Sequence, residues 1–359
     1  MVLMSAPDGP YNGNFNPLSN VPSNPLSNVP KFNYQDILDG SAREDIIQAM
    51  QQYAFFYIIN IPGFDAHAEV EAIKAFFSLP QAVKERCASI KHNANNTNIL
   101  RGYGFTKSTT GQPIEEVFNM GQYEERKITL SDVESNAEFI SREPNKWPGD
   151  EDFSASKEFR SALQSGFEMR MRLGRRLVEE IGRGLDYTQF GEKFTESEFT
   201  SFYLKKYTAR EEKDNVNIYK ADSGYSMKAE DGRDLSIPSH VDTTITLLTT
   251  YANGGLQALY KGEWYDVPSV MGSIMLMSGS LIEELSDGKL PSLRHRVIDI
   301  KSDRYSTPFF FNPSYHAKIC ESLSGKRTET GKEWVTFGPW QVKQLHRDEP
   351  LLLTPTSLN

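Results

Sequence analysis

The amino-acid sequence predicts an α+β protein built on a double-stranded β-helix, or jelly roll, with flanking α-helices that include one long helix packed on the barrel. Two features of the hydrophobic pattern predict this fold. Apolar residues between positions 159 and 185 recur at the spacing of one helix face. After that segment the period changes to two, and many short strands separated by Gly, Asp and Pro turns are typical of a double-sheet jelly roll. The expected strands cover residues 217–219, 244–248, 256–259, 273–277 and 307–311.

Changes in composition divide the 359 residues into five expected regions. The first 30 residues are rich in Pro, Asn and Ser and contain a direct repeat, which indicates a flexible arm or an extended arm laid on the body. We expect 1–30 to be this N-terminal arm, 31–150 an α/β support, 151–195 the long helical segment, 196–320 the jelly-roll core and 321–359 a C-terminal extension.

Local signals place a few elements in the support region. Ser41 and Glu44 have the spacing of a capping box that would open an amphipathic helix. The aromatic and β-branched run from residue 54 to 60 predicts a buried strand. The stretch from 88 to 147 is polar and interrupted by turn residues, so we expect loops there. Loops on a rigid scaffold often contact a ligand, which makes Arg101 and Tyr103 candidate substrate contacts, unless they are ordinary loop residues.

The composition is that of a globular protein, with 24% charged and 38% hydrophobic residues and a net charge of -9. No cluster of Lys and Arg is long enough to follow a phosphate backbone, so nucleic acid is not an expected partner. No run of 18 apolar residues and no leader pattern is present, so we expect a cytoplasmic protein without a membrane partner. Cys87 and Cys320 match no metal or redox spacing, as expected for reduced thiols.

Three residues have the spacing of a mononuclear metal site. His240 and Asp242 are two positions apart, and residues i and i+2 of a strand project from the same face. His295 follows in a second apolar segment. Two His and one carboxylate form the facial triad that suits Fe(II) and leaves coordination positions open. We therefore predict that His240, Asp242 and His295 are metal ligands with a catalytic role.

A second pair has the spacing of an organic-acid anchor. Arg304 and Ser306 alternate on one expected strand, where a guanidinium and a hydroxyl can bind the same carboxylate. A His-x-Asp triplet alone arises often by chance. The triplet followed by a distant His and then by Arg-x-Ser is a much more specific combination.

Together these motifs resemble the 2-oxoglutarate and Fe(II)-dependent dioxygenases of the isopenicillin N synthase-like group. The resemblance covers residues 32 to 315 and rests on further motifs as well. They are Thr246-Leu247-Leu248, Gly254-Gly255-Leu256-Gln257, Trp264, Asp287-Gly288 followed by Ser292 and His295-Arg296-Val297, Asn217-Ile218-Tyr219, and Phe76-Phe77-Ser78-Leu79-Pro80 with Lys84. The sequence departs from the family pattern at Gly279-Ser280, where Gly-Asp is common, and at Asp287, where Asn is usual.

The resemblance implies an oxidoreductase with non-haem iron at His240, Asp242 and His295. It implies 2-oxoglutarate as co-substrate, with its far carboxylate on Arg304 and Ser306 and further hydrogen bonds from Tyr219 and Asn217. The reaction would consume O₂, with ascorbate as a candidate reductant, and would hydroxylate, desaturate or cyclise a small organic molecule in the biosynthesis of a specialised metabolite. No obligate protein partner is expected.

Three alternatives remain open from the sequence. In a 2-oxoglutarate-independent Fe(II) oxidase of the same fold, Arg304 and Ser306 would hold the substrate's own carboxylate. A non-catalytic small-molecule binding module would keep the pocket without the chemistry, although such a module does not need three ligands at metal spacing. The same ligands could also hold Zn or Mn in a hydrolase or isomerase, because affinity order alone does not select iron.

The sequence says less about the substrate. Tyr103, Phe309 and Phe311 are candidates for an apolar pocket wall, although both phenylalanines could instead be core residues behind the barrel. A carboxylate substrate would require a second cation in the pocket, for which Arg101 and Arg294 are candidates.

Overall fold

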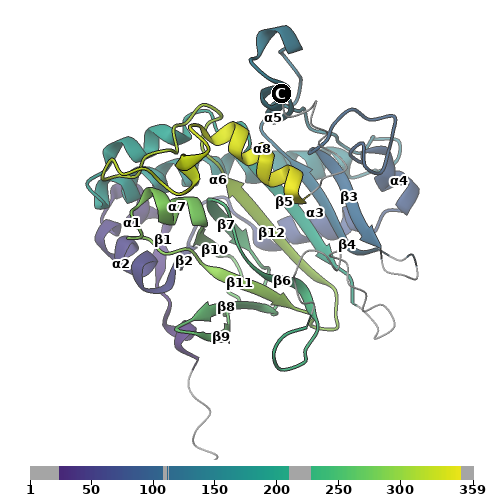
Figure 1. The fold of residues 1–359 in the computed structure, drawn as a ribbon. Coiled ribbons are helices and arrows are strands. Elements are labelled where there is room, and N and C mark those ends of the chain that lie inside the picture. Colours follow the sequence, from purple (N-terminus) through teal and green to yellow (C-terminus); the bar gives the residue numbers. More distant parts are fainter. Residues whose placement is uncertain (1–23, 108–110, 112, 210–227, 349–359) are drawn as a thin grey trace, which may run out of the picture.

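Two β-sheets form the centre of the protein in the computed structural model, which describes residues 24–107, 111, 113–209 and 228–348. Figure 1 shows the smaller sheet in the lower part of the view, with helices around the larger one. The larger sheet has the strand order β1-β2-β10-β7-β12-β5-β4-β3. Its strands in chain order are β1 (Lys31–Asn33), β2 (Phe55–Ile59), β3 (Gly102–Lys107), β4 (Pro113–Met120), β5 (Ser201–Tyr207), β7 (Ile245–Thr249), β10 (Ile274–Ser278) and β12 (Arg304–Phe311).

The smaller sheet completes the jelly roll and has the order β6-β11-β8-β9. Its strands are β6 (Leu235–Val241), β8 (Leu256–Tyr260), β9 (Glu263–Asp266) and β11 (Arg294–Ile298). The double-sheet core confirms the fold class that the alternating pattern predicts. Strands β7, β8, β10 and β12 overlap the expected segments, whereas the segment 217–219 lies outside the described residues.

The long helix α6 (Ser156–Gly184) packs on the larger sheet, as its apolar spacing predicts. The ring centroid of Phe167 lies 5.2 Å from that of Phe309 on β12. Helix α6 comes close to this strand at Gly174, where an added Cβ would lie 2.9 Å from the ring of Phe311. Glycine therefore permits the approach, and β12 is fixed between the helix layer and the interior of the barrel.

Shorter helices complete the molecule, and among the described residues none is long and apolar enough to cross a membrane. They are the α-helices α1 (Tyr34–Asp39), α2 (Arg43–Tyr53), α3 (Ala66–Phe77), α4 (Gln81–Arg86), α5 (Asn136–Ser141), α7 (Ser280–Leu285) and α8 (Phe337–Asp348), and the 3₁₀-helices η1 (Pro25–Asn28), η2 (Leu130–Asp132), η3 (Thr188–Phe194) and η6 (Thr330–Lys332).

Two local expectations for the support region were wrong. Helix α2 begins at Arg43 with Ala42 at its N-cap and no side-chain cap, because the Ser41 hydroxyl donates instead to the Asp36 carbonyl. The stretch expected to be loops contains the hairpin of β3 and β4, which extends the larger sheet beyond β5. Gly102 and Gly104 have no side chain, so the sequence of β3 does not show the polar and apolar alternation of a strand. Consequently the support region and the core share one continuous sheet.

The described part of the N-terminal arm is packed against the body. Leu26 and Val29 are buried, and the side-chain amide of Asn24 donates to the Asp266 carbonyl at 2.7 Å. Residues 1–23 lie outside the described part of the chain.

Candidate active site

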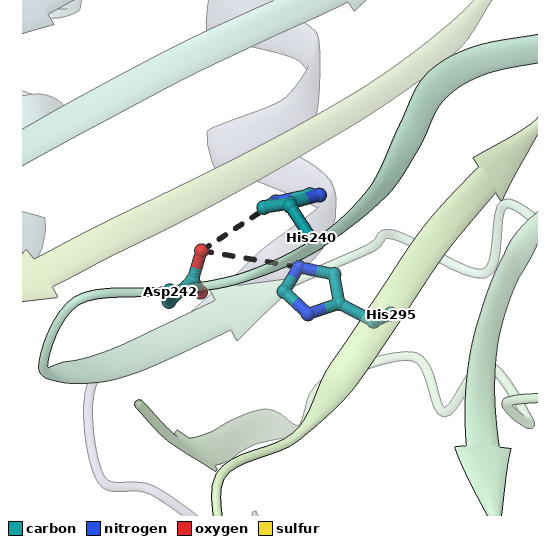
Figure 2. Close-up of side chains that lie close together, drawn as sticks. All are labelled: His240, Asp242 and His295. Atoms are coloured by element: carbon teal, nitrogen blue, oxygen red, sulfur yellow. Dashed lines mark ion pairs between the residues drawn. The ribbon is translucent and has the colours of Figure 1, made fainter. Parts of the chain in front are cut away.

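The two histidines face each other on neighbouring strands, and the carboxylate follows directly after one of them. Antiparallel pairing of β6 with β11 places His240 opposite His295, with ring centroids 4.2 Å apart. Oδ1 of Asp242 lies 3.6 Å from Nε2 of His240 and 3.9 Å from Nε2 of His295 (Figure 2). One ligand atom from each residue lies within 4.8 Å of the others, so the three side chains can hold one metal ion.

Hydrogen bonds leave one atom of each side chain available to the metal. Nδ1 of His240 lies 2.9 Å from the Pro238 carbonyl, and Nδ1 of His295 lies 3.1 Å from the Leu293 carbonyl. A carbonyl can only accept, so each Nδ1 carries the proton and each Nε2 keeps its lone pair. Thr246 donates to Oδ2 of Asp242 at 2.5 Å, which leaves Oδ1 facing the imidazoles. This donor set of two nitrogens and one oxygen fits the facial triad of Fe(II).

Electrostatics keep two of these groups in the state that a metal requires. Burial and the neighbouring His240 lower the pKa of His295 to about 4, so its imidazole is neutral. Burial opposes ionisation of Asp242, but His295, His240 and Thr246 hold the pKa of its carboxyl well below the ordinary value. Burial also opposes protonation of His240, yet the bond to Asp242 outweighs it and raises the pKa of His240. Without metal, His240 is therefore the first of the three to take up a proton as the pH falls.

Gly279 fixes the turn that carries Asp242. The backbone nitrogen of Ser280 donates to the Asp242 carbonyl at 2.9 Å, and that of Leu281 donates to the Thr243 carbonyl at 2.9 Å. A Cβ on Gly279 would lie 2.6 Å from the Asp242 carbonyl oxygen and 2.2 Å from the Thr244 carbonyl oxygen. Only glycine fits between these backbones. The turn that carries Asp242 is therefore fixed by direct contact with the main chain of residues 279–281.

Arg304 and Ser306 form a cationic pair deep in the larger sheet. Nε of Arg304 donates to the Gly254 carbonyl at 3.0 Å, and one terminal nitrogen donates to the Ser306 hydroxyl at 3.1 Å. Arg304 is 2% exposed, and burial lowers the pKa of its guanidinium. Among the described residues no carboxylate lies within ion-pair distance of it. Burying a cation without a paired anion destabilises the folded protein. Such an unpaired buried cation is expected in a site that receives an anionic ligand.

Strand register shows that this pair lies on the face of the larger sheet that is turned toward the metal cluster. Phe310 lies opposite Thr246, the residue that bonds to Asp242. Strand alternation puts Arg304 and Ser306 on the same face as Phe310. The neighbouring strand β5 adds Tyr207 opposite Arg304 and Lys205 opposite Ser306.

The opposite face of the sheet holds three residues suggested as a pocket wall. Phe309 and Phe311 are fully buried, with the Phe309 ring against Phe167 and the Phe311 ring stacked on Phe194. Tyr103 is buried too and donates to Glu116 at 2.7 Å. These contacts make all three core residues between sheet and helices, which corrects their assignment to a wall. Alternation from Arg304 and Ser306 already excludes positions 309 and 311 from that face.

The remaining sequence candidates are placed as follows. Arg101 is fully buried, and its terminal nitrogens donate to Asn119, Ser201 and the carbonyls of Met120 and Thr200. Asn217 and Tyr219 lie outside the described residues. Sequence reasoning missed Lys205, Tyr207 and Phe310. The aromatic residues Phe202, Tyr203 and Tyr207 were a weak strand signal that could have identified β5.

We predict that Gly279→Ala weakens metal binding about tenfold, because the added methyl must displace backbone on which Asp242 depends. Gly191→Ala is the matched control, since its Cβ would meet its nearest neighbour at 3.5 Å, an ordinary contact. Calorimetric titration with Mn(II), a redox-stable substitute, measures both affinities. A folded Gly279→Ala protein with unchanged affinity would contradict this role of the glycine.

Two family models match the chain and together cover more than half of it. The 2OG-Fe(II) oxygenase superfamily matches residues 212–313, and the N-terminal region described as non-haem dioxygenase in morphine synthesis matches residues 26–150. A 2-oxoglutarate-Fe(II) type oxidoreductase from Aspergillus fumigatus is 27% identical over 314 residues, which are 81% of this chain and 83% of the relative. Isopenicillin N synthase from Amycolatopsis lactamdurans is 25% identical over 84% of this chain and 89% of its own length.

The solved structures agree on the fold. A full-length Neurospora crassa protein, solved in complex with alpha-KG and 5-formyluracil, superposes with a TM-score of 0.66 at 21% identity, over 89% of this chain and 96% of that one. The family models, the relatives and the His-Asp-His cluster all lead to the same assignment. The chain belongs to the 2OG-Fe(II) oxygenase superfamily and is a 2-oxoglutarate-dependent dioxygenase with Fe(II) as its metal.

Proposed function

We propose that this dioxygenase oxidises an unactivated C–H bond of a small organic metabolite, by hydroxylation, desaturation or oxidative cyclisation, in the biosynthesis of a specialised metabolite. One observation carries the proposal. The metal-ligand cluster lies next to the face of the larger sheet that carries Arg304, a buried arginine with no carboxylate within ion-pair distance among the described residues. A cytoplasmic location and the absence of an obligate protein partner remain part of this proposal.

His240, Asp242 and His295 would hold the iron. When bound, Fe(II) supplies the activation of O₂ coupled to oxidation of 2-oxoglutarate to succinate and carbon dioxide. The protein fixes the tautomer of both imidazoles through the Pro238 and Leu293 carbonyls and directs one carboxylate oxygen through Thr246. These bonds orient the ligands before the metal arrives, which is the usual contribution of outer-shell partners.

Arg304 and Ser306 would bind the far carboxylate of 2-oxoglutarate. The guanidinium offers a fork of donors that matches a carboxylate, and the adjacent hydroxyl can add a further bond. Tyr207 is the tyrosine beside this pair, because it lies opposite Arg304 and its ring centroid is 5.3 Å from the guanidinium carbon. The additional hydrogen bonds expected from Tyr219 and Asn217 stay a prediction, because both residues lie outside the described part of the chain.

The organic substrate would bind against the partly exposed aromatic residues on the metal-facing side of the sheet. Tyr203 and Phe310 meet edge to face, with ring centroids 5.4 Å apart. Both lie on the face that carries Arg304 and Ser306, so they replace Phe309 and Phe311 as candidates for the apolar wall. Such a wall would hold a hydrocarbon surface close to the metal and exclude water from it.

The first test is succinate formation from 2-oxoglutarate by the Fe(II)-loaded protein in air. We expect slow turnover without an organic substrate, faster turnover with an accepted one from a panel of carboxylates, terpenoids and phenolics, and none in His240→Ala. His67→Ala, which alters an exposed histidine on α3, should match the unmodified protein. Iron binding without succinate under any condition would favour the 2-oxoglutarate-independent oxidase.

Replacing the anchor arginine should weaken co-substrate binding. We predict that Arg304→Ala raises the 2-oxoglutarate concentration for half-maximal succinate formation about tenfold or more, since a bond to a charged group contributes about 1.5 to 3 kcal/mol. Arg172→Ala, which removes an arginine with a 65% exposed side chain, is the control. An unchanged requirement in Arg304→Ala would sink the assignment.

Acidification should release iron, and His240 should respond first. Because the pKa of His240 is raised above the ordinary value of about 6.5, protons compete with the metal already near neutral pH. We therefore expect Fe(II) affinity, measured anaerobically, to fall as the pH drops from about 8 to about 6, with release of about one proton per metal at the lower pH. Equal affinity at both pH values would contradict competition between protons and the metal at His240.

A further inference from the structure

An ion pair lies beside the proposed co-substrate anchor, and the reaction described above does not use it. Nζ of Lys205 on β5 lies 2.9 Å from Oε1 of Glu115 on β4. Their side chains are 19% and 16% exposed, so the pair is neither on the open surface nor in the core. Ion pairs that still contact water contribute little to stability, whereas charges that line a site can act on a ligand.

Strand register places the pair on the same face as the anchor. Lys205 lies directly opposite Ser306, and Tyr207 lies opposite Arg304. On the other side of β5, Glu115 lies opposite Tyr207. Directly opposed residues have Cβ atoms about 5 Å apart, so all five side chains belong to one patch of the sheet.

Two cations meet at the buried ring of Tyr207. The guanidinium carbon of Arg304 lies 5.3 Å from the ring centroid, and Nζ of Lys205 lies 5.8 Å from it. Among the described residues Glu115 is the carboxylate paired with Lys205, whereas Arg304 has none. The patch therefore holds one more positive charge than its own carboxylate neutralises.

We propose that Lys205 is a second cation of the anchor and acts on the far carboxylate of 2-oxoglutarate, while Glu115 holds the lysine in place and weakens its effect. The inference rests on the proposed role of Arg304. The ammonium charge of Lys205 attracts a carboxylate that arrives beside Ser306, whichever of its three donors are already engaged. Glu115 competes for the same ammonium and repels the incoming anion, so it lowers the affinity for the co-substrate.

A pair of ligands that differ only at the far end tests this role without catalysis. 2-Oxoglutarate and 2-oxopentanoate share the metal-chelating end, but 2-oxopentanoate has a methyl group in place of the far carboxylate. Calorimetry on the Mn(II)-loaded protein gives the dissociation constant of each. We expect Lys205→Met to weaken 2-oxoglutarate binding about tenfold and to leave 2-oxopentanoate binding unchanged. Lys205→Arg, which keeps the charge, should retain most of the affinity.

Glu115→Gln should act in the opposite direction and strengthen 2-oxoglutarate binding about threefold, again without effect on 2-oxopentanoate. Misfolding cannot raise the affinity, so this variant remains informative even if Lys205→Met is unstable. Equal changes for both ligands, or no change for either, would overturn the proposal and assign Lys205 to the chelating end, to the organic substrate or to structure alone.

Arg304→Met distinguishes a failure of the proposed role of Lys205 from a failure of the proposed role of Arg304. If it reduces binding of 2-oxoglutarate but not of 2-oxopentanoate while Lys205→Met does not, the anchor stands and the role of Lys205 is wrong. If Arg304→Met also fails to distinguish the two ligands, the anchor itself has been misplaced.

Discussion

The site depends on the register between β6 and β11, which puts His240 directly opposite His295. A slip of one residue in either strand would turn one imidazole to the other face of the smaller sheet, because side chains alternate with a period of two. Register is strongly specified where one face is buried, and His295 at 5% exposure is on such a face. The metal cluster is thus a consequence of sheet packing, and Asp242 joins it through the turn fixed against Gly279.

On the other side of the larger sheet, a buried charge network fixes the position of two helices. Arg170 of α6 makes two bonds to Glu69 of α3, at 2.9 and 2.7 Å, and a third to Thr249 of β7 at 3.2 Å. Tyr251 adds a bond from its hydroxyl to Glu69. Removing one member would leave a buried charge unpaired, which typically costs about 3 to 5 kcal/mol. The network therefore fixes both helices against β7, the strand whose Thr246 bonds to Asp242.

Sequence alone could predict the donor set, because His240 and Asp242 are two residues apart, as are Arg304 and Ser306, and a distant His completes the facial triad. The position of His295 opposite His240 is a consequence of the long-range pairing of β6 with β11. Sequence alone could not place Tyr207, because only the long-range pairing of β5 with β12 brings this tyrosine opposite Arg304. The hairpin of β3 and β4 was missed for a related reason. Glycine weakens the local strand signal, whereas the pairing with β5 that holds the hairpin is long-range.

The distribution of charge explains why metal and co-substrate should bind together. Asp242 is ionised and His295 neutral in the free protein, so the metal end carries negative charge whenever His240 is unprotonated, while Arg304 leaves the opposite end positive. A divalent cation alone would leave the arginine uncompensated, and a dicarboxylate alone would place one of its charges beside Asp242. Only the two together neutralise both ends in a site partly removed from water, where uncompensated charge is most unfavourable. The fold therefore places a carboxylate and a cation at separate positions along the sheet, and in the proposed site this separation would favour a ligand that chelates a metal at one end and carries a second carboxylate at the other.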